Sequence, residues 1–190
     1  MSELTKTPVF PLQLFLLPGE RTQLHIFEDR YKALMHHCLN KHNVFGLACN
    51  ARENVQNLGS LVRISKVIRR YAGGEMDVEI ECFGLFRLRK FFYRMEDASW
   101  PGGLIEAWTN PLMELSEDDE LKSNEDGRHI DPKSVLNAIL GLQLSLTDKL
   151  AFARISDPVK QNEFLESRKR LLSLLTEQED ARFEDSIYLN

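Results

Sequence analysis

The chain has 190 residues, of which 43% are hydrophobic and 28% are charged, and its formal net charge is -5. This composition excludes a disordered chain, and the length allows one large or two small domains. The acidic balance disfavours general affinity for nucleic acid or anionic membranes. No apolar run approaches the roughly 18 residues that cross a bilayer, and the N-terminus lacks the features of a signal peptide. We therefore expect a soluble, cytoplasmic protein without membrane partners.

Strands are predicted to dominate residues 1–112. The apolar run 9–17 ends at Pro18-Gly19, a turn dipeptide. One apolar stripe predicts a helix over 27–39, and its members are Phe27, Tyr31, Leu34, Met35, Cys38 and Leu39. Further strands are expected at 21–27, 44–49, 61–71, 76–83 and 104–108, with the glycine-containing residues 72–75 as a hairpin loop between 61–71 and 76–83. Many short strands, one helix and glycine-containing turns predict a closed or strongly coiled antiparallel barrel.

The clearest alternation runs from Met76 to Cys82, and we expect it to continue past Gly84. In that register Phe86, Leu88 and Phe92 point into the barrel. Arg87, Arg89, Phe91 and Tyr93 then share the outward face.

An acidic segment at 113–131, poor in apolar residues, is predicted to be a solvated linker. Beyond it, residues 132–190 follow helical periodicity, with helices beginning at Pro132 and Pro158 and a short one capped by Thr147. A stripe from Phe164 to Leu175 marks the last helix, and the tail after it is expected to be frayed.

The sequence contains, in this order, "FPLQLFLLPG", a strand that ends in Phe, a helix, "FGLA", and a hairpin that contains "GLFR". The same segments recur in the same order in the N-terminal, substrate-binding domain of Lon proteases, which the chain resembles. The matching positions are Phe10, Pro11, Leu12, Pro18, Gly19, Phe27, Arg30, Gly59, Ile64, Gly84, Leu85, Phe86 and Arg87. The resemblance implies an α+β fold, namely a PUA-like antiparallel β-barrel with one inserted helix, followed by a C-terminal helical region.

The resemblance also implies a function. The sequence contains neither a Gly-x-x-x-x-Gly-Lys-Ser/Thr loop for nucleotide binding nor a Gly-x-Ser-x-Gly elbow. A stand-alone recognition domain that binds unfolded or exposed polypeptide segments without cleaving them is therefore expected, with no catalytic residue, metal or cofactor. A protease or chaperone system as partner and a homo-oligomer both remain open.

Other classes of site have weaker support. His36, His37 and Cys38 with His42 could suggest a metal site, but His37 and Cys38 are adjacent on a helix and face different directions, so solvated histidines are the simpler interpretation. Asp77, Glu79 and Glu81 could suggest catalytic carboxylates, yet neighbouring strands rich in arginine favour cross-strand ion pairs.

Two alternative functions remain open. PUA-like barrels in other families bind RNA, and residues 58–95 carry a net charge of +4 beside aromatic residues. A hydrolase whose site is not apparent from the sequence is the second alternative.

The candidate polypeptide-binding residues are Phe91, Tyr93, Trp100, Arg87 and Arg89. The outward aromatic pair is either covered by the helical region or left available to a partner. Trp100 precedes a Pro-Gly-Gly loop, and a tryptophan on a loop is typical of contact sites. The three cysteines lie in apolar patterns and are predicted to be reduced and buried.

Overall fold

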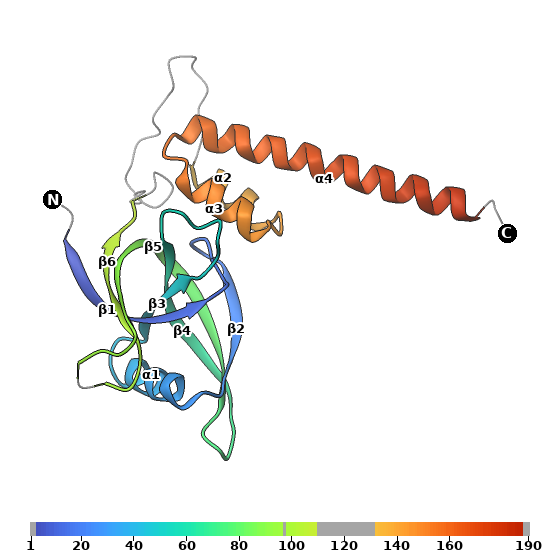
Figure 1. Cartoon of the computed structure of the whole chain (residues 1–190). Helices are drawn as coiled ribbons and strands as arrows, with labels where there is room; N and C mark the ends of the chain where they lie inside the picture. Colours follow the sequence, from blue (N-terminus) through green and yellow to red (C-terminus); the bar gives the residue numbers. More distant parts are fainter. Residues whose placement is uncertain (1–2, 97, 110–131, 188–190) are drawn as a thin grey trace.

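The computed structural model describes residues 3–96, 98–109 and 132–187. The strands are β1 (Leu4–Leu12), β2 (Arg21–Ile26), β3 (Val44–Cys49), β4 (Leu58–Arg70), β5 (Met76–Phe92) and β6 (Gly102–Ala107). The helices are α1 (Asp29–Asn40), α2 (Pro132–Leu140), α3 (Leu146–Arg154) and α4 (Pro158–Ile187). The strand-rich region is thus followed by a helical one, as predicted (Figure 1).

The strands form one six-stranded sheet in the order β2-β5-β4-β3-β1-β6. The last strand in this order, β6, also pairs with β5. The five strands β5, β4, β3, β1 and β6 are therefore joined in a closed ring of pairings. The prediction of an antiparallel sheet is wrong for one pair, because β1 and β3 run parallel. Parallel neighbours need a long crossover, which β2 and α1 supply here.

Glycine permits two turns: one lies between β1 and β2, and the other closes the β4–β5 hairpin. Gly19 has a φ of 89° in the turn after Pro18, where the Glu20 N–H donates to the Leu17 carbonyl at 3.0 Å. Gly74 has a φ of 86° in the β4–β5 hairpin. Side chains rarely adopt such angles, so the predicted turn chemistry is confirmed at both positions.

Irregularities in β5 change which face its side chains occupy. Cys82 pairs with Val62 and Gly84 pairs with Leu61, so one extra residue is inserted in β5. After this bulge Leu85 joins the main core, while Phe86 joins a separate cluster with Val9, Ala48 and Ile105. Phe86 is therefore buried as predicted, but on the opposite face of the strand from Cys82.

Each strand of the ring contributes to this second cluster. Its members are Val9 from β1, Ala48 from β3, Phe86 from β5 and Ile105 from β6, with Leu61 of β4 packed against them. Gly46 and Gly59 leave room for the Phe86 ring, since an added Cβ at Gly59 would lie 2.3 Å from Phe86 Cζ. The Phe86 ring thus occupies the space that these glycines leave open.

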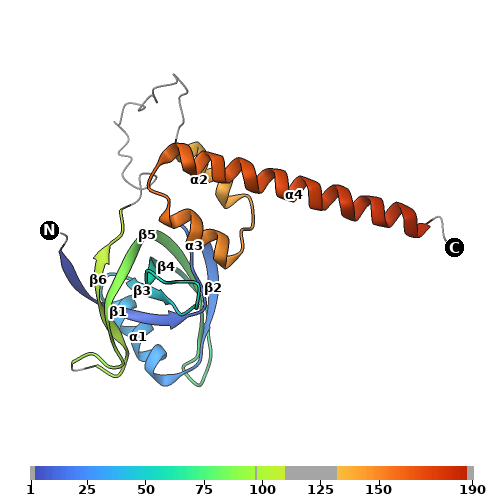
Figure 2. The same cartoon turned by 45° about the horizontal axis from the view of Figure 1, so that its top comes forward.

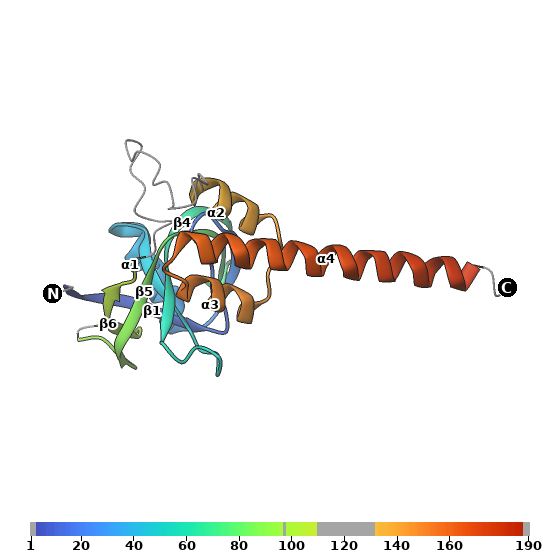
Figure 3. The ribbon, with the colours of Figure 1, turned by 90° about the horizontal axis from the view of Figure 1, so that it is seen from above.

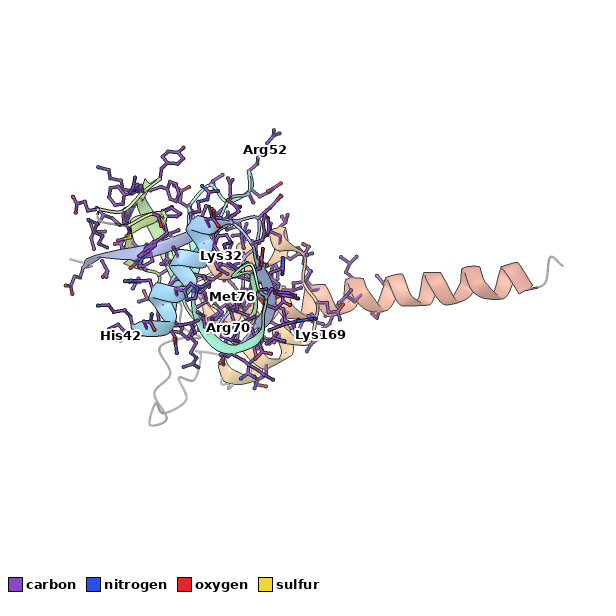
Figure 4. All side chains as sticks on the ribbon, turned by 90° about the horizontal axis from the view of Figure 1, so that it is seen from below. Lys32, His42, Arg52, Arg70, Met76 and Lys169 are labelled. Carbon is purple, nitrogen blue, oxygen red and sulfur yellow. The ribbon has the colours of Figure 1, made fainter. Side chains whose placement is uncertain are left out.

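Helix α1 packs against the larger core through Tyr31, Leu34, Met35 and Cys38, as its apolar stripe predicted. Phe27 does not belong to that stripe, because the helix begins two residues later and the Phe27 side chain is 60% exposed. Lys32 on this helix donates from Nζ to the Gly73 carbonyl of the β4–β5 hairpin at 3.2 Å. Figure 4 shows this side of the molecule, with Lys32 and Met76 labelled.

The C-terminal helices lie at one end of the sheet (Figure 2). Val135, Ile139, Leu150, Phe152, Ala153 and Leu165 belong to the same hydrophobic cluster as the main core. The Trp108 Nε1–H donates to the Ala153 carbonyl at 2.9 Å, and Lys149 pairs with Glu20 at 2.6 Å. The predicted linker, 113–131, lies outside the described residues.

Two helix termini differ from the predictions. α3 is capped by Ser145, whose hydroxyl accepts from the Asp148 N–H, and Thr147 lies inside the helix. α4 begins at Pro158 as predicted, but it continues to Ile187 instead of fraying, and its second half extends away from the body (Figure 3). Among the helices of the described residues, none has the length and apolar character needed to span a membrane.

Candidate functional site

Two adjacent surface hollows share lining residues from β1 and α1. The first, which we call the Tyr93 hollow, has a volume of about 410 Å³ and is lined by Pro11, Arg30, Tyr31, Ala48, Cys49, Asn50, Asn57, Leu88, Phe91, Tyr93 and Pro101. The second, the β2 hollow, has about 390 Å³ and is lined by Phe10, Pro11, Leu12, Leu24, His25, Ile26, Phe27, Glu28, Arg30, Tyr31 and Asn50. Pro11, Arg30, Tyr31 and Asn50 line both, and we call the pair the Arg30 groove.

Arg30 forms the partition between the hollows and is held by its neighbours. Its Nε donates to Glu28 Oε2 at 2.9 Å, and its guanidinium lies 4.5 Å from the Tyr31 ring centroid. The Tyr31 ring packs in turn on Phe10, with centroids 4.1 Å apart. Burial raises the pKa of the Tyr31 hydroxyl. Because the ion pair and the ring stack together hold the guanidinium in place, Arg30 offers a fixed cation between the two hollows.

Phe91 and Tyr93 form one wall of the Tyr93 hollow. Their rings meet edge to face at a centroid distance of 5.2 Å. Tyr93 is 86% exposed, which agrees with the prediction that it faces outward. Phe91 is half-buried and packs against the small cluster around Phe86.

The predicted register of Phe91 and Phe92 is wrong. In the β5–β6 ladder Leu88 pairs with Ile105 while Lys90 pairs with Leu104, so a second irregularity shifts the alternation. As a result Phe91 packs on the side of Leu88, where Phe92 was expected. Phe92 instead lies beneath the ammonium groups of Lys6 and Lys90, at 6.0 and 5.3 Å from the ring centroid.

The other three predicted residues do not line the groove. Arg87 stacks over Trp108, with its guanidinium carbon 4.3 Å from the ring centroid. Arg89 donates from Nε to Glu106 at 2.6 Å. Trp100 is half-buried against the His37 ring, 4.8 Å away. The structure thus brings together only Phe91 and Tyr93 of the predicted set.

The acidic residues of β5 bond to neighbouring segments, and the predicted ion pairs with arginine are confirmed for Glu81, whereas Asp77 bonds histidine and tyrosine instead. Asp77 accepts from the Tyr71 hydroxyl at 2.6 Å and bonds His25 Nδ1 at 2.6 Å, and these bonds lower the pKa of Asp77. Glu81 pairs with Arg63 and Arg21, and the hydrogen bond from Arg63 lowers the pKa of Glu81. Each carboxylate is thereby engaged by a neighbouring strand.

The thiols are buried and free of disulfides, as predicted. Burial raises the pKa of both Cys38 and Cys82 to about 12, so these thiols stay protonated at neutral pH. A protonated, enclosed thiol is a poor nucleophile, so neither Cys38 nor Cys82 is suited to nucleophilic catalysis. Within the residues that the structure describes, no group of three His, Cys, Asp or Glu side chains is arranged to hold a metal ion.

Sequence reasoning did not identify Pro11, Arg30, Asn50 and Asn57 as groove residues. Pro11 and Arg30 were noted only as recurring family positions, and their place in the order of elements was the available signal. Asn57 has a φ of 53°, a backbone conformation that asparagine tolerates better than most residues, but a lone Asn in a loop does not reveal it. The groove forms only when β1, α1 and β5 come together.

Comparisons with known proteins agree on one family. The family model for the ATP-dependent protease La (LON) substrate-binding domain matches residues 6–179. A crystal structure of a Lon N-terminal domain protein from Xanthomonas campestris is 25% identical, with a TM-score of 0.60, and the match covers 86% of this chain and 98% of that one. The N-terminal domain of Mycobacterium avium complex Lon protease is 13% identical, with a TM-score of 0.54 and coverage of 86% and 97%. No curated protein matches.

Proposed function

Because this chain belongs to the family of Lon substrate-binding domains, we propose that it is a non-catalytic module that binds exposed segments of client polypeptides in the Arg30 groove. The placement of the binding site in the Arg30 groove is supported above all by the aromatic wall of the Tyr93 hollow. There an 86% exposed tyrosine stands against a half-buried phenylalanine, beside about 410 Å³ of open space. Large aromatic side chains at the rim of a preformed hollow are typical of binding hot spots.

The composition of the groove supports a polypeptide ligand. Pro11 and Leu88 offer apolar surface, while the Asn50 and Asn57 side chains are exposed and carry amide groups. An amide has both a donor and an acceptor, and so it can bond to a peptide backbone whatever its side chains are. A site of this kind favours apolar segments without demanding one sequence.

The neutralised charges on β4 and β5 count against the RNA alternative. Arg63 pairs with Glu81 and Arg89 pairs with Glu106, so these guanidinium groups already have carboxylate partners. Phosphate binding would have to compete with those ion pairs.

The remaining expectations belong to the same proposal. The ring of strand pairings supports a PUA-like barrel, and the barrel and helical regions, 1–112 and 132–190, share one hydrophobic cluster. We expect the protein to act in the cytoplasm and to pass clients to a protease or chaperone system.

The test is the affinity for a permanently unfolded probe, reduced and carboxymethylated α-lactalbumin, measured by fluorescence anisotropy. Tyr93→Ala should weaken binding by roughly 5- to 30-fold, the usual effect of truncating an aromatic hot spot. Phe83→Ala is the matched control, since Phe83 is also exposed on β5 but lies beside Arg63, outside the groove. Equal effects of the two substitutions would contradict the location, and absence of binding by the unaltered protein would contradict the function. Binding to a short RNA that falls steeply with salt would support the alternative.

A further inference from the structure

One edge of the sheet beside the Arg30 groove has unpaired backbone groups. β2 pairs with β5 in an unbroken antiparallel register from Arg21↔Glu81 to Ile26↔Met76, and β5 is its only partner among the described strands. Just before this ladder the Cys82 N–H donates to the Glu20 carbonyl at 2.9 Å. The N–H and C=O groups of successive residues in a strand point to opposite edges, so those of Thr22, Leu24 and Ile26 point to β5, as the Glu20 carbonyl does. The N–H and C=O groups of Arg21, Gln23 and His25 therefore point to the opposite edge.

β1 lies across the β2 hollow from this edge but does not pair with it. Val9 directs its N–H to the Pro101 carbonyl, at 3.1 Å, and Leu12 accepts from the Asn50 N–H on the β3 side. By the same alternation Pro11 faces β2, and proline has no N–H to donate. The edge of β2 thus remains without a strand partner on the side of β1.

The β2 hollow borders this edge. Its lining includes the successive residues 24–28 on and after β2 and the successive residues 10–12 on β1. Side chains of a strand alternate between its two faces, so a hollow lined by consecutive residues must adjoin the edge. The lining is largely apolar, with Leu24, Ile26 and Phe27 on one side.

We propose that an extended segment of a client polypeptide pairs with the free edge of β2 as an additional strand, placing an apolar side chain in the β2 hollow. The proposal rests on the proposed function and specifies how that site holds its ligand. Main-chain bonds to Arg21, Gln23 and His25 give affinity that does not depend on sequence, and the hollow selects for apolar side chains. Arg30 and Pro11, which line both hollows, then lie between this strand and the aromatic wall of Tyr93.

The shape of the edge favours a single extended chain over a second copy of the protein. The space beside β2 is about 390 Å³, enough for one or two side chains. A second copy that approached through its own β2 would carry β5 beside it, because the two strands are paired along all of β2. A flexible segment brings no such attached sheet.

The first test leaves the protein unaltered. The probe is the tightest-binding decapeptide from an array of overlapping peptides that covers reduced, carboxymethylated α-lactalbumin. Each of its amides is N-methylated in turn, and affinity is measured by anisotropy. We expect losses of about tenfold at every second position and little change between them, because alternate N–H groups of an added strand bond to its neighbour. Uniform tolerance of N-methylation would overturn the proposal.

The second test alters the edge. Gln23→Pro removes an N–H that faces the groove and should weaken binding of the same peptide by about tenfold or more, whereas Gln23→Ala should leave it within about twofold. Thermal unfolding of both variants establishes that they fold. If Gln23→Pro does not fold, the N-methylation result decides.

The outcomes separate the two proposals. If neither N-methylation nor Gln23→Pro changes the affinity for the peptide, the strand addition is overturned and the proposed function stands. If no probe binds at all, both proposals are overturned. Self-association of the free protein that Gln23→Pro abolishes, measured by sedimentation, would assign the edge to a second copy and overturn the proposal.

Discussion

The packing of Phe86 between two glycines permits a double-mutant test of the ring interior. Gly46 and Gly59 both face the Phe86 ring, but they differ in what else an added methyl group would meet. At Gly46 a Cβ would lie 2.9 Å from Phe86 Cε1 and 3.0 Å from Cζ, and the next atom, Val9 Cγ2, is at 3.4 Å. At Gly59 it would also lie 2.5 Å from the Leu47 carbonyl oxygen, which is backbone and cannot swing away.

These distances set the expected magnitudes. Optimal carbon contacts are about 3.5–4.0 Å, so Gly46→Ala forces the fully buried ring to move by more than about half an ångström. Overpacking of that kind costs about 1–3 kcal/mol, which corresponds to a fall in melting temperature of about 2–4 °C for each kcal/mol in a chain of this size. Phe86→Leu removes both clashing ring atoms, so in the Phe86→Leu background Gly46→Ala should cost little. Gly59→Ala should remain costly there, because the Leu47 carbonyl has not moved.

Urea unfolding followed by circular dichroism measures the six proteins: the unaltered chain, the three single variants and the two doubles. The expected coupling between Gly46→Ala and Phe86→Leu is favourable by about 1 kcal/mol or more, within the usual range for residues in contact. Gly59→Ala with Phe86→Leu should show a smaller coupling. Equal costs of Gly46→Ala in both backgrounds would refute the claim that the Phe86 ring limits the space inside the ring of strands.

Two further variants test buried and exposed polar contacts. Ser60→Ala should lower the free energy of unfolding by about 1–3 kcal/mol, since the fully buried Ser60 hydroxyl accepts from the Leu16 N–H at 2.9 Å and donates to its carbonyl at 2.8 Å; an unchanged urea midpoint would contradict this. Asp77→Asn should lower the free energy of unfolding at neutral pH, because bonds from Tyr71 and His25 depress the folded-state pKa of Asp77. The loss should become smaller as the pH falls below 3.8, since protonation of Asp77 then removes this stabilisation from the unaltered protein as well. A difference in the free energy of unfolding between Asp77→Asn and the unaltered protein that stays constant from pH 7 to pH 2.5 would count against that reasoning.

Local signals predicted well those elements that local chemistry determines. The hairpin of β4 and β5, the Pro18-Gly19 turn and the helix starts at Pro132 and Pro158 all follow from residues close in sequence. The apolar stripe of α1 likewise predicted its buried residues, Tyr31 included.

Features that depend on distant strands were missed. The two irregularities in β5, near Phe83 and Arg89, place residues on faces that simple alternation assigns wrongly, and each depends on the strand opposite. The parallel pairing of β1 with β3 follows from the three-dimensional path of the chain. The Arg30 groove joins residues from Pro11 to Pro101, so no window of sequence contains it. The outward position of Tyr93 was predicted correctly, although the register that placed Phe91 beside it on that face was wrong.

The long C-terminal helix has a geometric consequence for anything joined to its end. α4 spans 30 residues, or about 45 Å at 1.5 Å per residue, and its second half leaves the body of the protein. Each residue removed from that half shortens the reach by about 1.5 Å and turns the attached object by about 100° around the axis. Removing seven residues restores nearly the original orientation at a distance about 10 Å shorter. Reach and azimuth relative to the Arg30 groove are therefore coupled, and changing the length in steps of about seven residues alters the reach while nearly keeping the azimuth.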